Sequence, residues 1–277
     1  MLKNLASVIC CFVSLLSCAQ DVKNDSAQHK TLNQVQLIKP NKMKVEIWSD
    51  VMCPFCYIGK RKFEKALNQF TENKDIEIIW KSYQLDPNSV TDPSLNSIKH
   101  LAAKKGWSDA QAKETSDYVT NLAKQVGLTF NFDKAVVANS FDAHRLSHLA
   151  LEKGVQDKLE EALFKAYFTD GKNTADAKTL LELGLSVGLT EADINKVLTS
   201  NQYAEDVKFD INEANQLGVK GVPFFVFDRK YAVSGAQESE TFFKTLDKAY
   251  TEWRKANPKT TLEVTEGAVC TPDGECK

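Results

Sequence analysis

Residues 45–59 read VEIWSDVMCPFCYIG and place two cysteines where a strand gives way to a helix. The alternation of polar and apolar side chains over residues 44–49 predicts the strand. Apolar residues then recur every three or four positions as far as Phe70, which predicts a helix that begins near Pro54. β-branched and aromatic residues over 76–83 predict a second strand. The chain therefore presents, in order, a strand, a Cys-x-x-Cys motif, a helix and another strand.

The position of the two cysteines in this motif gives each a distinct chemistry. Cys53 lies at the expected N-terminus of the helix, where unpaired backbone N–H groups and the helix dipole favour a thiolate. Cys56 lies one turn further on, close enough to attack a mixed disulfide formed on Cys53. Pro54 is tolerated in the first turn, because its missing N–H would have no partner there. We therefore expect Cys53 to be the nucleophile and Cys56 the resolving thiol.

This order of elements is the opening half of a thioredoxin fold, and signals for the closing half return near the C-terminus. Strand signals reappear only over 224–227 and 231–233, and residues 237–254 predict a final amphipathic helix. Between the two halves, the sequence DPS at 92–94 predicts a helix start. Helical periodicity then recurs over the segments 108–126, 134–152, 155–168, 175–187 and 190–199.

The sequence therefore predicts an α/β protein with a thioredoxin-like fold and a large all-helical insertion. We expect the thioredoxin-like domain over 43–90 and 205–256, the insertion over 91–204, and a C-terminal tail over 257–277. With 43% apolar and 26% charged residues, a chain of 277 residues can bury a core without disulfide staples.

The sequence GVPF at 221–224 comes directly before the late strand. A cis bond between Val222 and Pro223 costs little there, because proline reduces the preference for trans. In thioredoxin folds, this proline lies against the active-site cysteines, and the residue before it offers backbone hydrogen bonds to an extended peptide. We expect Val222 and Pro223 to form a substrate groove with Pro54 and Phe55. A proline that simply begins a strand is the alternative.

The first 18 residues are typical of an export signal. One lysine precedes an apolar run from Leu5 to Leu16, which is shorter than the roughly 20 residues that span a membrane. The sequence LLSC at 15–18 resembles a bacterial lipobox, in which Cys18 is lipidated. We expect a lipoprotein signal over 1–18, a polar tether over 19–42, and an exported protein anchored by lipid in the periplasm or cell envelope. Plain export and a cytosolic protein remain alternatives.

Charge and composition argue against several classes of function. The net charge is −2, from 35 basic and 37 acidic residues, and no basic stripe is interleaved with aromatics. We therefore do not expect nucleic-acid binding, which requires a basic surface. His144 and His148 lie four residues apart on a predicted helix, but no HExxH arrangement accompanies them. We expect no metal and no cofactor, and a core or surface role for these histidines.

Four blocks of sequence together resemble the FrnE-like branch of the DsbA family. They are residues 45–59, NSFDAHRL at 139–146, AYF at 166–168 and VKGVPFFV at 219–226. The resemblance covers about 43–255 and implies a thioredoxin-like protein disulfide oxidoreductase. It also implies that Asn139, Ser140 and His144 line the cleft beside the insertion. Related 2-hydroxychromene-2-carboxylate isomerases and kappa-class glutathione transferases typically have serine at the position of Cys53, so the thiol favours redox chemistry here.

A further cysteine pair lies in the tail, where Cys270 and Cys276 flank the turn sequence Pro-Asp-Gly. Some FrnE-like proteins have a second pair in their tail, and the resemblance implies a shuttle that exchanges with Cys53 and Cys56. A small disulfide formed in an oxidising compartment is an equal alternative. A zinc site shared with the first pair is a third.

The leading hypothesis for function is dithiol–disulfide exchange with protein thiol and disulfide substrates, supported by a redox-recycling partner. The first alternative is a glutathione-dependent small-molecule isomerase or transferase of the 2-hydroxychromene-2-carboxylate isomerase type. The second is a non-catalytic, peptide-binding holdase. The direction of exchange depends on the reduction potential of the pair relative to that of its compartment, which the sequence does not fix.

Overall fold

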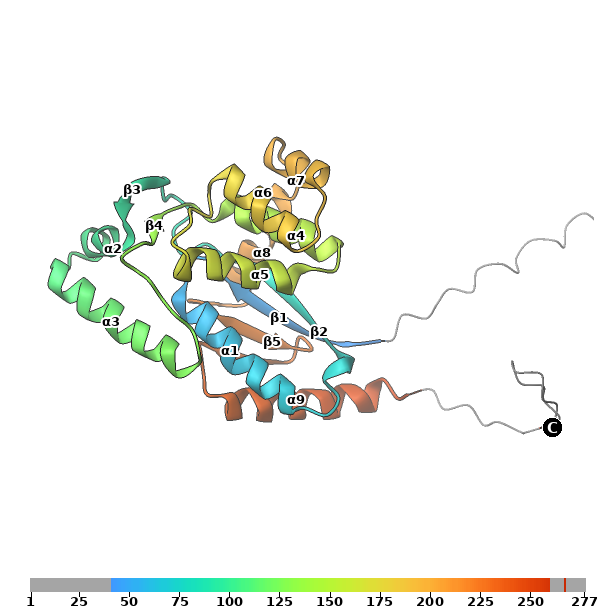
Figure 1. Ribbon diagram of the computed structural model, residues 1–277. Helices are drawn as coiled ribbons and strands as arrows, with labels where there is room; N and C mark the ends of the chain where they lie inside the picture. The colour runs from blue at the N-terminus through green and yellow to red at the C-terminus, as the bar shows by residue number, and fades with distance from the viewer. Residues whose placement is uncertain (1–40, 260–266, 268–277) are drawn as a thin grey trace, which may run out of the picture. The chain divides into compact units, whose positions relative to one another are not determined.

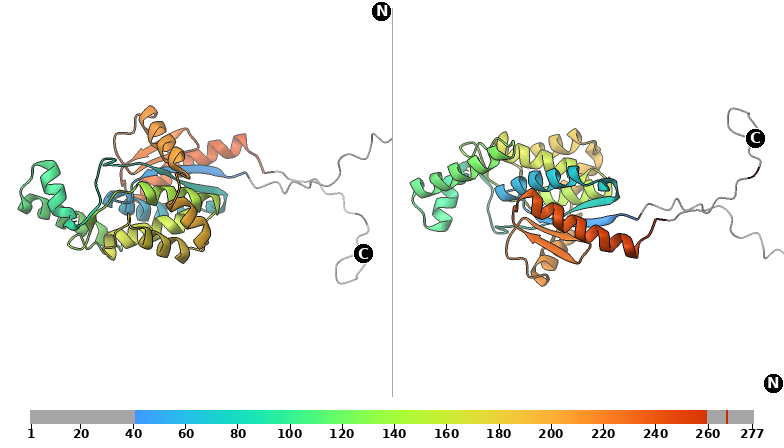
Figure 2. Two further views of the ribbon diagram at one scale, coloured as in Figure 1. Left: turned by 90° about the horizontal axis from the view of Figure 1, so that it is seen from above. Right: turned by 90° about the horizontal axis from the view of Figure 1, so that it is seen from below.

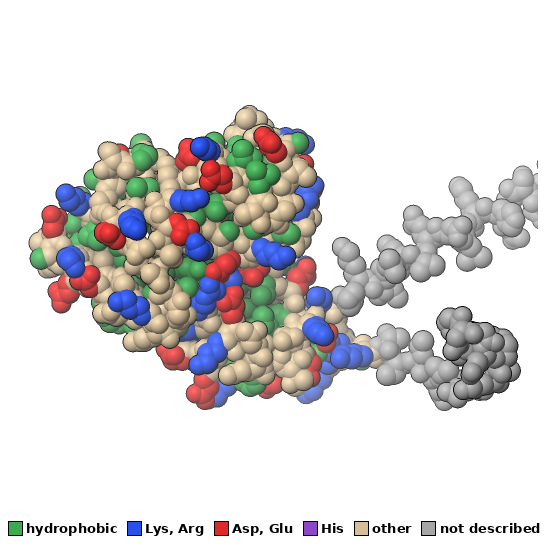
Figure 3. Space-filling model, in the orientation of Figure 1, with side chains coloured by type: hydrophobic (Ala, Val, Ile, Leu, Met, Phe, Trp, Pro, Cys, Tyr) green, Lys and Arg blue, Asp and Glu red, His purple; other side chains and the backbone are tan. Residues whose placement is uncertain are grey.

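The computed structural model describes residues 41–259 and residue 267. The expected signal, nearly all of the tether, and the cysteines Cys18, Cys270 and Cys276 lie outside these residues. Within the described ranges, no helix is both long enough and apolar enough to cross a bilayer. Basic and acidic side chains are interspersed over the face that Figure 3 shows.

A mixed four-stranded sheet forms the centre of the thioredoxin-like half (Figure 1). Its strands are β1 (Met43–Ser49), β2 (Ile76–Ser82), β5 (Phe224–Phe227) and β6 (Tyr231–Ser234). They lie in the order β2-β1-β5-β6, with β1 parallel to β2 and the other neighbours antiparallel. A parallel pair needs a crossover connection, and helix α1 (Pro54–Gln69) makes it. The predicted strand, helix and strand are therefore confirmed.

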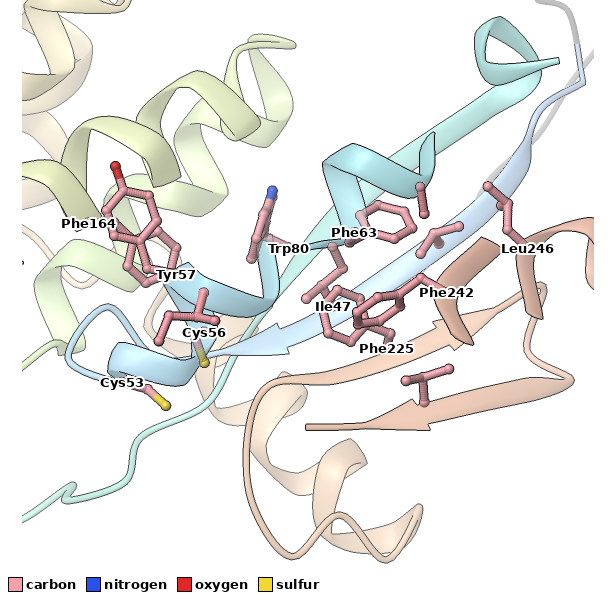
Figure 4. Packing of buried hydrophobic residues seen from close by; sticks show 14 of the residues in the cluster. Ile47, Cys53, Cys56, Tyr57, Phe63, Trp80, Phe164, Phe225, Phe242 and Leu246 are labelled. Atoms are coloured by element: carbon pink, nitrogen blue, oxygen red, sulfur yellow. The ribbon is translucent and has the colours of Figure 1, made fainter. Parts of the chain in front are cut away.

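Both faces of strand β1 are covered by helices, which explains why its sequence is apolar at most positions. Helices α1 and α9 (Ser239–Ala256) lie side by side on one face, and α8 (Ala204–Gln216) packs on the other (Figures 1 and 2). Phe63 of α1 packs against Phe225 of β5, with 5.5 Å between ring centroids (Figure 4). On the opposite face, the Trp48 indole is buried against α8.

The insertion is mostly helical, as predicted, and also contains a small β-ribbon. Its helices are α2 (Ser97–Lys105), α3 (Asp109–Gln125), α4 (Phe141–Glu152), α5 (Gln156–Phe164), the π-helical turn η2 (Lys165–Thr169), α6 (Ala177–Ser186) and α7 (Glu191–Leu198). The ribbon pairs β3 (Asp92–Asn96) with β4 (Val136–Val137). Helices α2 and α3 form a hairpin that projects from the sheet in both Figures 1 and 2. Gly106 ends α2 in the left-handed region (φ 66°), which lets the chain turn into α3.

The helix start predicted at residues 92–94 is wrong. Residues 92–96 form strand β3 and pair at both ends with β4, so the backbone is extended where the helix was expected. The helix begins at Ser97 instead. The Asn96 side chain caps it by accepting a hydrogen bond from the N–H of Ile98 at 2.9 Å. The Asp92 carboxylate accepts the N–H of Ser94 at 2.9 Å in the same way, so the local hydrogen bonds do not decide the helix start. The pairing of residues 92–96 with β4 delays the helix until after Asn96.

Two other helix predictions need correction. The helix expected over 134–152 begins only at Phe141, because residues 136–137 pair with β3 and Asn139 accepts a hydrogen bond from the N–H of Phe141 at 2.9 Å. Helix α8 was not predicted. A short 3₁₀ turn, η1 (Asn73–Asp75), precedes β2.

Candidate active site

The two cysteines of the motif lie at the start of helix α1, at the end of the central strand β1 (Figure 4). Cys53 is the N-cap residue, with extended backbone (φ −91°, ψ 112°), and Pro54 follows in the first turn. The N–H of Cys53 donates to the carbonyl of Asp50 at 2.9 Å, and the N–H of Cys56 donates to the carbonyl of Cys53 at 3.0 Å. This tight turn presents the first sulfur at the positive end of the helix.

The two thiols have different surroundings. Cys56 is fully buried, whereas Cys53 keeps 4% of its surface exposed. Burial raises the pKa of the Cys56 thiol well above its ordinary value, and the neighbouring Cys53 acts in the same direction. Cys56 therefore tends to stay protonated until a disulfide forms beside it. This asymmetry fits a first thiol that meets the substrate and a second that resolves the intermediate.

The segment that contains Pro223 lies directly against these thiols. The Val222–Pro223 bond is cis, as the sequence predicted. The Cys53 thiol lies 3.5 Å from the carbonyl oxygen of Val222, to which it donates a hydrogen bond. The residue before the proline therefore contacts the sulfur of Cys53 through its backbone.

Gly59 of α1 makes this approach possible, and sequence reasoning missed its role. A Cβ atom at this position would lie 2.9 Å from Cγ of Pro223, which is closer than side chains pack. Glycine inside a helix costs about 1 kcal/mol relative to alanine. A glycine in the middle of an amphipathic helix is therefore a signal of close packing that could have identified this contact from the sequence.

Asp50 fixes the loop that leads into the motif, and it too was missed as a site residue. Its side chain is buried, with 2% of the residue exposed. One carboxylate oxygen accepts from the N–H of Met52 at 3.2 Å, and the other accepts from the N–H of Leu85 at 2.7 Å. Asp50 thus ties the cysteine loop to the segment after β2.

A cavity of about 450 Å³ opens beside Cys53, between the motif and the α2–α3 hairpin. The walls are formed by Cys53, Phe55 and Val222 on one side and Ile98, Leu101 and Val119 on the other. An ion pair between Lys104 and Asp86, at 2.6 Å, lies at its edge. The space is therefore a mainly apolar chamber next to the reacting sulfur, and its second wall belongs to the insertion.

The structure separates the three residues that were expected to line a cleft. Ser140 lines the cavity beside Cys53. His144 lies behind it, buried, with Nε2 3.7 Å from Oδ1 of Asp50. Asn139 faces a different pocket and donates to the carbonyl of Ser89 at 2.9 Å, so it shapes a loop.

His148, one helical turn beyond His144 on α4, belongs to a separate polar cluster. Its Nε2 lies 3.2 Å from a carboxylate oxygen of Asp210 and 3.1 Å from the hydroxyl of Ser82. Across residues 41–259, no group of three or more His, Cys, Asp or Glu side chains is arranged to hold a metal ion. The thiols of Cys53 and Cys56 lie beside Val222, Pro223 and the cavity.

Comparison with known proteins identifies close likenesses for this arrangement. The family model described as DSBA-like thioredoxin domain matches residues 44–247. The crystal structure of a probable DsbA oxidoreductase from Streptomyces coelicolor is 38% identical, with a TM-score of 0.70, and the match covers 85% of this chain and 98% of that one. The uncharacterised protein YwbO of Bacillus subtilis is 26% identical over 204 residues, which make up 73% of this chain and 94% of that protein.

A more distant likeness is limited to the fold. The structure of a 2-hydroxychromene-2-carboxylate isomerase is 17% identical, with a TM-score of 0.51, and the match covers 79% of this chain and all of that one. The resemblance in fold to these isomerases, which the four blocks of sequence implied, is thereby confirmed.

Proposed function

Because the chain belongs to the family of DSBA-like thioredoxin domains, we propose that it is a thiol–disulfide oxidoreductase that acts on protein substrates through Cys53 and Cys56. One observation carries the proposal. Cys53 occupies the N-cap position of α1 and lines an apolar cavity, while Cys56 lies fully buried one turn behind it. This is the arrangement that two-step exchange requires, with one sulfur for the substrate and one for release.

The proposed exchange transfers two electrons in two displacement steps. In the oxidising direction, a substrate thiolate attacks the sulfur of Cys53 in the Cys53–Cys56 disulfide. A substrate–Cys53 disulfide forms, and Cys56 leaves as a thiolate that takes up a proton. A second substrate thiolate then attacks the substrate sulfur, which forms the substrate disulfide and releases Cys53. In the reducing direction, the same steps run backward, with Cys53 attacking a substrate disulfide and Cys56 resolving it.

The cavity favours a protein substrate over glutathione. Glutathione carries two carboxylates and an ammonium group, which need charged partners, whereas the chamber beside Cys53 is mainly apolar. Its rim lysine, Lys104, is already paired with Asp86. An apolar side chain near a substrate cysteine would fill this space and be removed from water, at about 25 cal/mol per Å² of buried apolar surface.

The proposal is tested by reduction of insulin with dithiothreitol. The wild-type chain is expected to accelerate the reaction, and Cys53→Ser is expected to abolish the acceleration. Cys56→Ser is expected to accumulate a mixed disulfide on Cys53 that mass spectrometry detects. Full activity of Cys53→Ser would disprove the proposal. Chaperone activity that survives loss of both cysteines would instead support a holdase.

A second experiment separates protein substrates from glutathione. Ile98→Ala widens the cavity wall on the α2 side. We expect it to slow reduction of a peptide disulfide with a large apolar residue next to cysteine, and to leave reduction of glutathione disulfide unchanged. Equal slowing with both substrates would contradict binding of an apolar side chain in this cavity.

We also propose that Cys270 and Cys276 exchange with the Cys53–Cys56 pair. The support is their spacing around a turn sequence and the resemblance to FrnE-like proteins. In Cys270→Ser/Cys276→Ser, the rate of reoxidation of the first pair should then fall. An unchanged rate would indicate that the tail pair is a simple disulfide.

The N-terminal sequence supports a further proposal, that the protein is exported and held at the membrane of the cell envelope by lipid on Cys18. Fractionation of cells is expected to recover the wild type with membranes and Cys18→Ser in the soluble fraction. The same fraction for both proteins would refute the anchor.

A further inference from the structure

Three buried ionisable side chains lie together behind the active-site loop. Asp50 comes from the loop after β1, His144 from α4 and Glu160 from α5. Their exposed fractions are 2%, 3% and 2%. The proposed exchange does not use any of them directly. Because unpaired buried charge is costly, this trio needs an explanation beyond packing.

Asp50 lies three residues before Cys53 and is joined to it through the backbone. The backbone carbonyl of Asp50 accepts a hydrogen bond from the N–H of Cys53 at 2.9 Å, and Asp50 lines the same cavity as Cys53. A buried carboxylate beside a thiol opposes formation of the thiolate, because like charges repel more strongly where water is excluded. The loop therefore gains hydrogen bonds from the Asp50 carboxylate and places that buried carboxylate near the nucleophile.

His144 is placed to compensate for that charge. Its Nε2 points to Oδ1 of Asp50 at 3.7 Å and has no hydrogen-bond partner among the described residues. Burial by itself lowers the pKa of His144, but the charges of Asp50 and Glu160 outweigh burial and leave the pKa above its ordinary value. The Asp50 carboxylate therefore favours the protonated imidazole.

Two further carboxyl groups lie on the helices packed against α4, and neither belongs to the active-site loop. Glu160 accepts a hydrogen bond from the hydroxyl of Ser147 at 2.6 Å, and burial raises the pKa of its own carboxyl. From α8, the facing carboxylate Asp210 is already bound to Lys81 and His148. The buried residues that α6 and α7 place in the shared cluster with α4 are apolar. Asp50 is thus the group on the active-site side that His144 can neutralise.

We propose that His144 is a positioning residue that neutralises Asp50 and thereby keeps the Cys53 thiolate available near neutral pH. The inference rests on the proposed function and adds a role for the insertion, which supplies the histidine. Protonation of His144 and formation of the thiolate then favour each other, and this coupling is reciprocal. A histidine that only held the insertion against the thioredoxin-like domain would affect the stability of the protein. It would leave the pH dependence of thiolate formation at Cys53 unchanged.

The first test is the pH profile of alkylation of the reduced protein by iodoacetamide, with Cys53 followed by peptide mapping. His144→Gln is expected to move the midpoint upward by about one pH unit, which lowers the rate about tenfold below the midpoint. His148→Gln is the matched control, one helical turn away and also paired with a buried aspartate, and it should keep the wild-type midpoint. A wild-type midpoint for folded His144→Gln would overturn the proposal.

A double-mutant cycle shows whether His144 acts through Asp50. In the background of Asp50→Asn, the carboxylate charge is absent, so His144→Gln should no longer move the midpoint. An equal shift in both backgrounds would show that His144 does not act through Asp50 and would overturn the inference. Alkylation measures thiolate formation without a substrate. If the variants shift the alkylation midpoint as expected but the wild-type protein does not reduce insulin, the proposed function is refuted and the role of His144 is not.

A measurement on the wild-type chain covers the case in which the variants do not fold. The chain has four histidines, so the NMR signal of His144 is identifiable by elimination with His29, His100 and His148 variants. We expect His144 to titrate at a higher pH in the reduced protein than in the oxidised one. The same titration midpoint in both redox states would contradict the coupling.

Discussion

Replacement of Gly59 by alanine tests whether close contact between α1 and the proline loop sets the geometry of the thiol. The new Cβ atom would lie 2.9 Å from Cγ of Pro223 and 3.5 Å from Phe225 and Ala236. The atom in its way belongs to a proline ring and has little freedom to rotate. The loop must therefore shift by a few tenths of an ångström, and the carbonyl of Val222 shifts with it.

The magnitude follows from two opposing effects. Alanine is favoured over glycine inside a helix by about 1 kcal/mol, whereas overpacking a core costs roughly 1–3 kcal/mol. Gly59→Ala should therefore lower the free energy of unfolding by about 1 kcal/mol. A 1 Å misplacement can cost roughly a hundredfold in rate, so this smaller shift should slow insulin reduction by about tenfold.

Gly184→Ala is the matched control for this substitution. Gly184 also lies inside a helix, α6, and its new Cβ would lie 2.7 Å from Cδ1 of Ile194, a side-chain tip that can rotate away. We expect its stability to change and its rate of insulin reduction to remain that of the wild type. Urea denaturation followed by tryptophan fluorescence gives the stabilities. A wild-type rate for Gly59→Ala, with a gain of about 1 kcal/mol in stability, would refute the reasoning.

Three further predictions concern the scaffold. Phe63→Ala should cost about 4 kcal/mol in urea denaturation, because the ring is 1% exposed and packed between aromatic rings. Asn96→Ala should cost about 1 kcal/mol by removing the cap of α2, and no loss would contradict the assigned helix start. Burial raises the pKa of Asp210, but its bonds to His148 and Lys81 bring it below the ordinary value. The unfolded state therefore binds more protons in acid, and this stability is present above pH about 4 and is lost as pH falls through the folded pKa. Asp210→Asn should lose about 3 kcal/mol at pH 7 and show a shallower fall in stability below pH 4, and a thermal-denaturation series that matched the wild type would refute the assignment.

The sequence alone was sufficient for the fold class and for the position of Cys53 and Cys56 at the start of a helix that follows a strand. The opening strand and helix were predictable because strong alternation, a Cys-x-x-Cys motif and helical periodicity all agree over residues 45–70. The Val222–Pro223 bond was predictable because proline carries its own conformational signal. These features depend on local chemistry, which a single sequence displays directly.

The remaining features depend on contacts between residues far apart in the chain. The start of α2 was misplaced because Asp92 and Asn96 have equal merit as caps until β3 pairs with β4. His144 was placed on the correct helix, but its partner Asp50 lies 94 positions earlier, and no sequence spacing connects them. The α2–α3 wall of the cavity was likewise invisible, because it forms only when the hairpin packs beside the motif.

The most direct test of the central claim is a redox titration of the full chain in glutathione buffers, with the Cys53–Cys56 disulfide quantified by peptide mapping. We expect one reversible two-electron transition between dithiol and disulfide at these two residues. The same transition should be present in Cys270→Ser/Cys276→Ser. Cys53 and Cys56 that stay as thiols at every glutathione ratio, in a folded protein, would contradict the account.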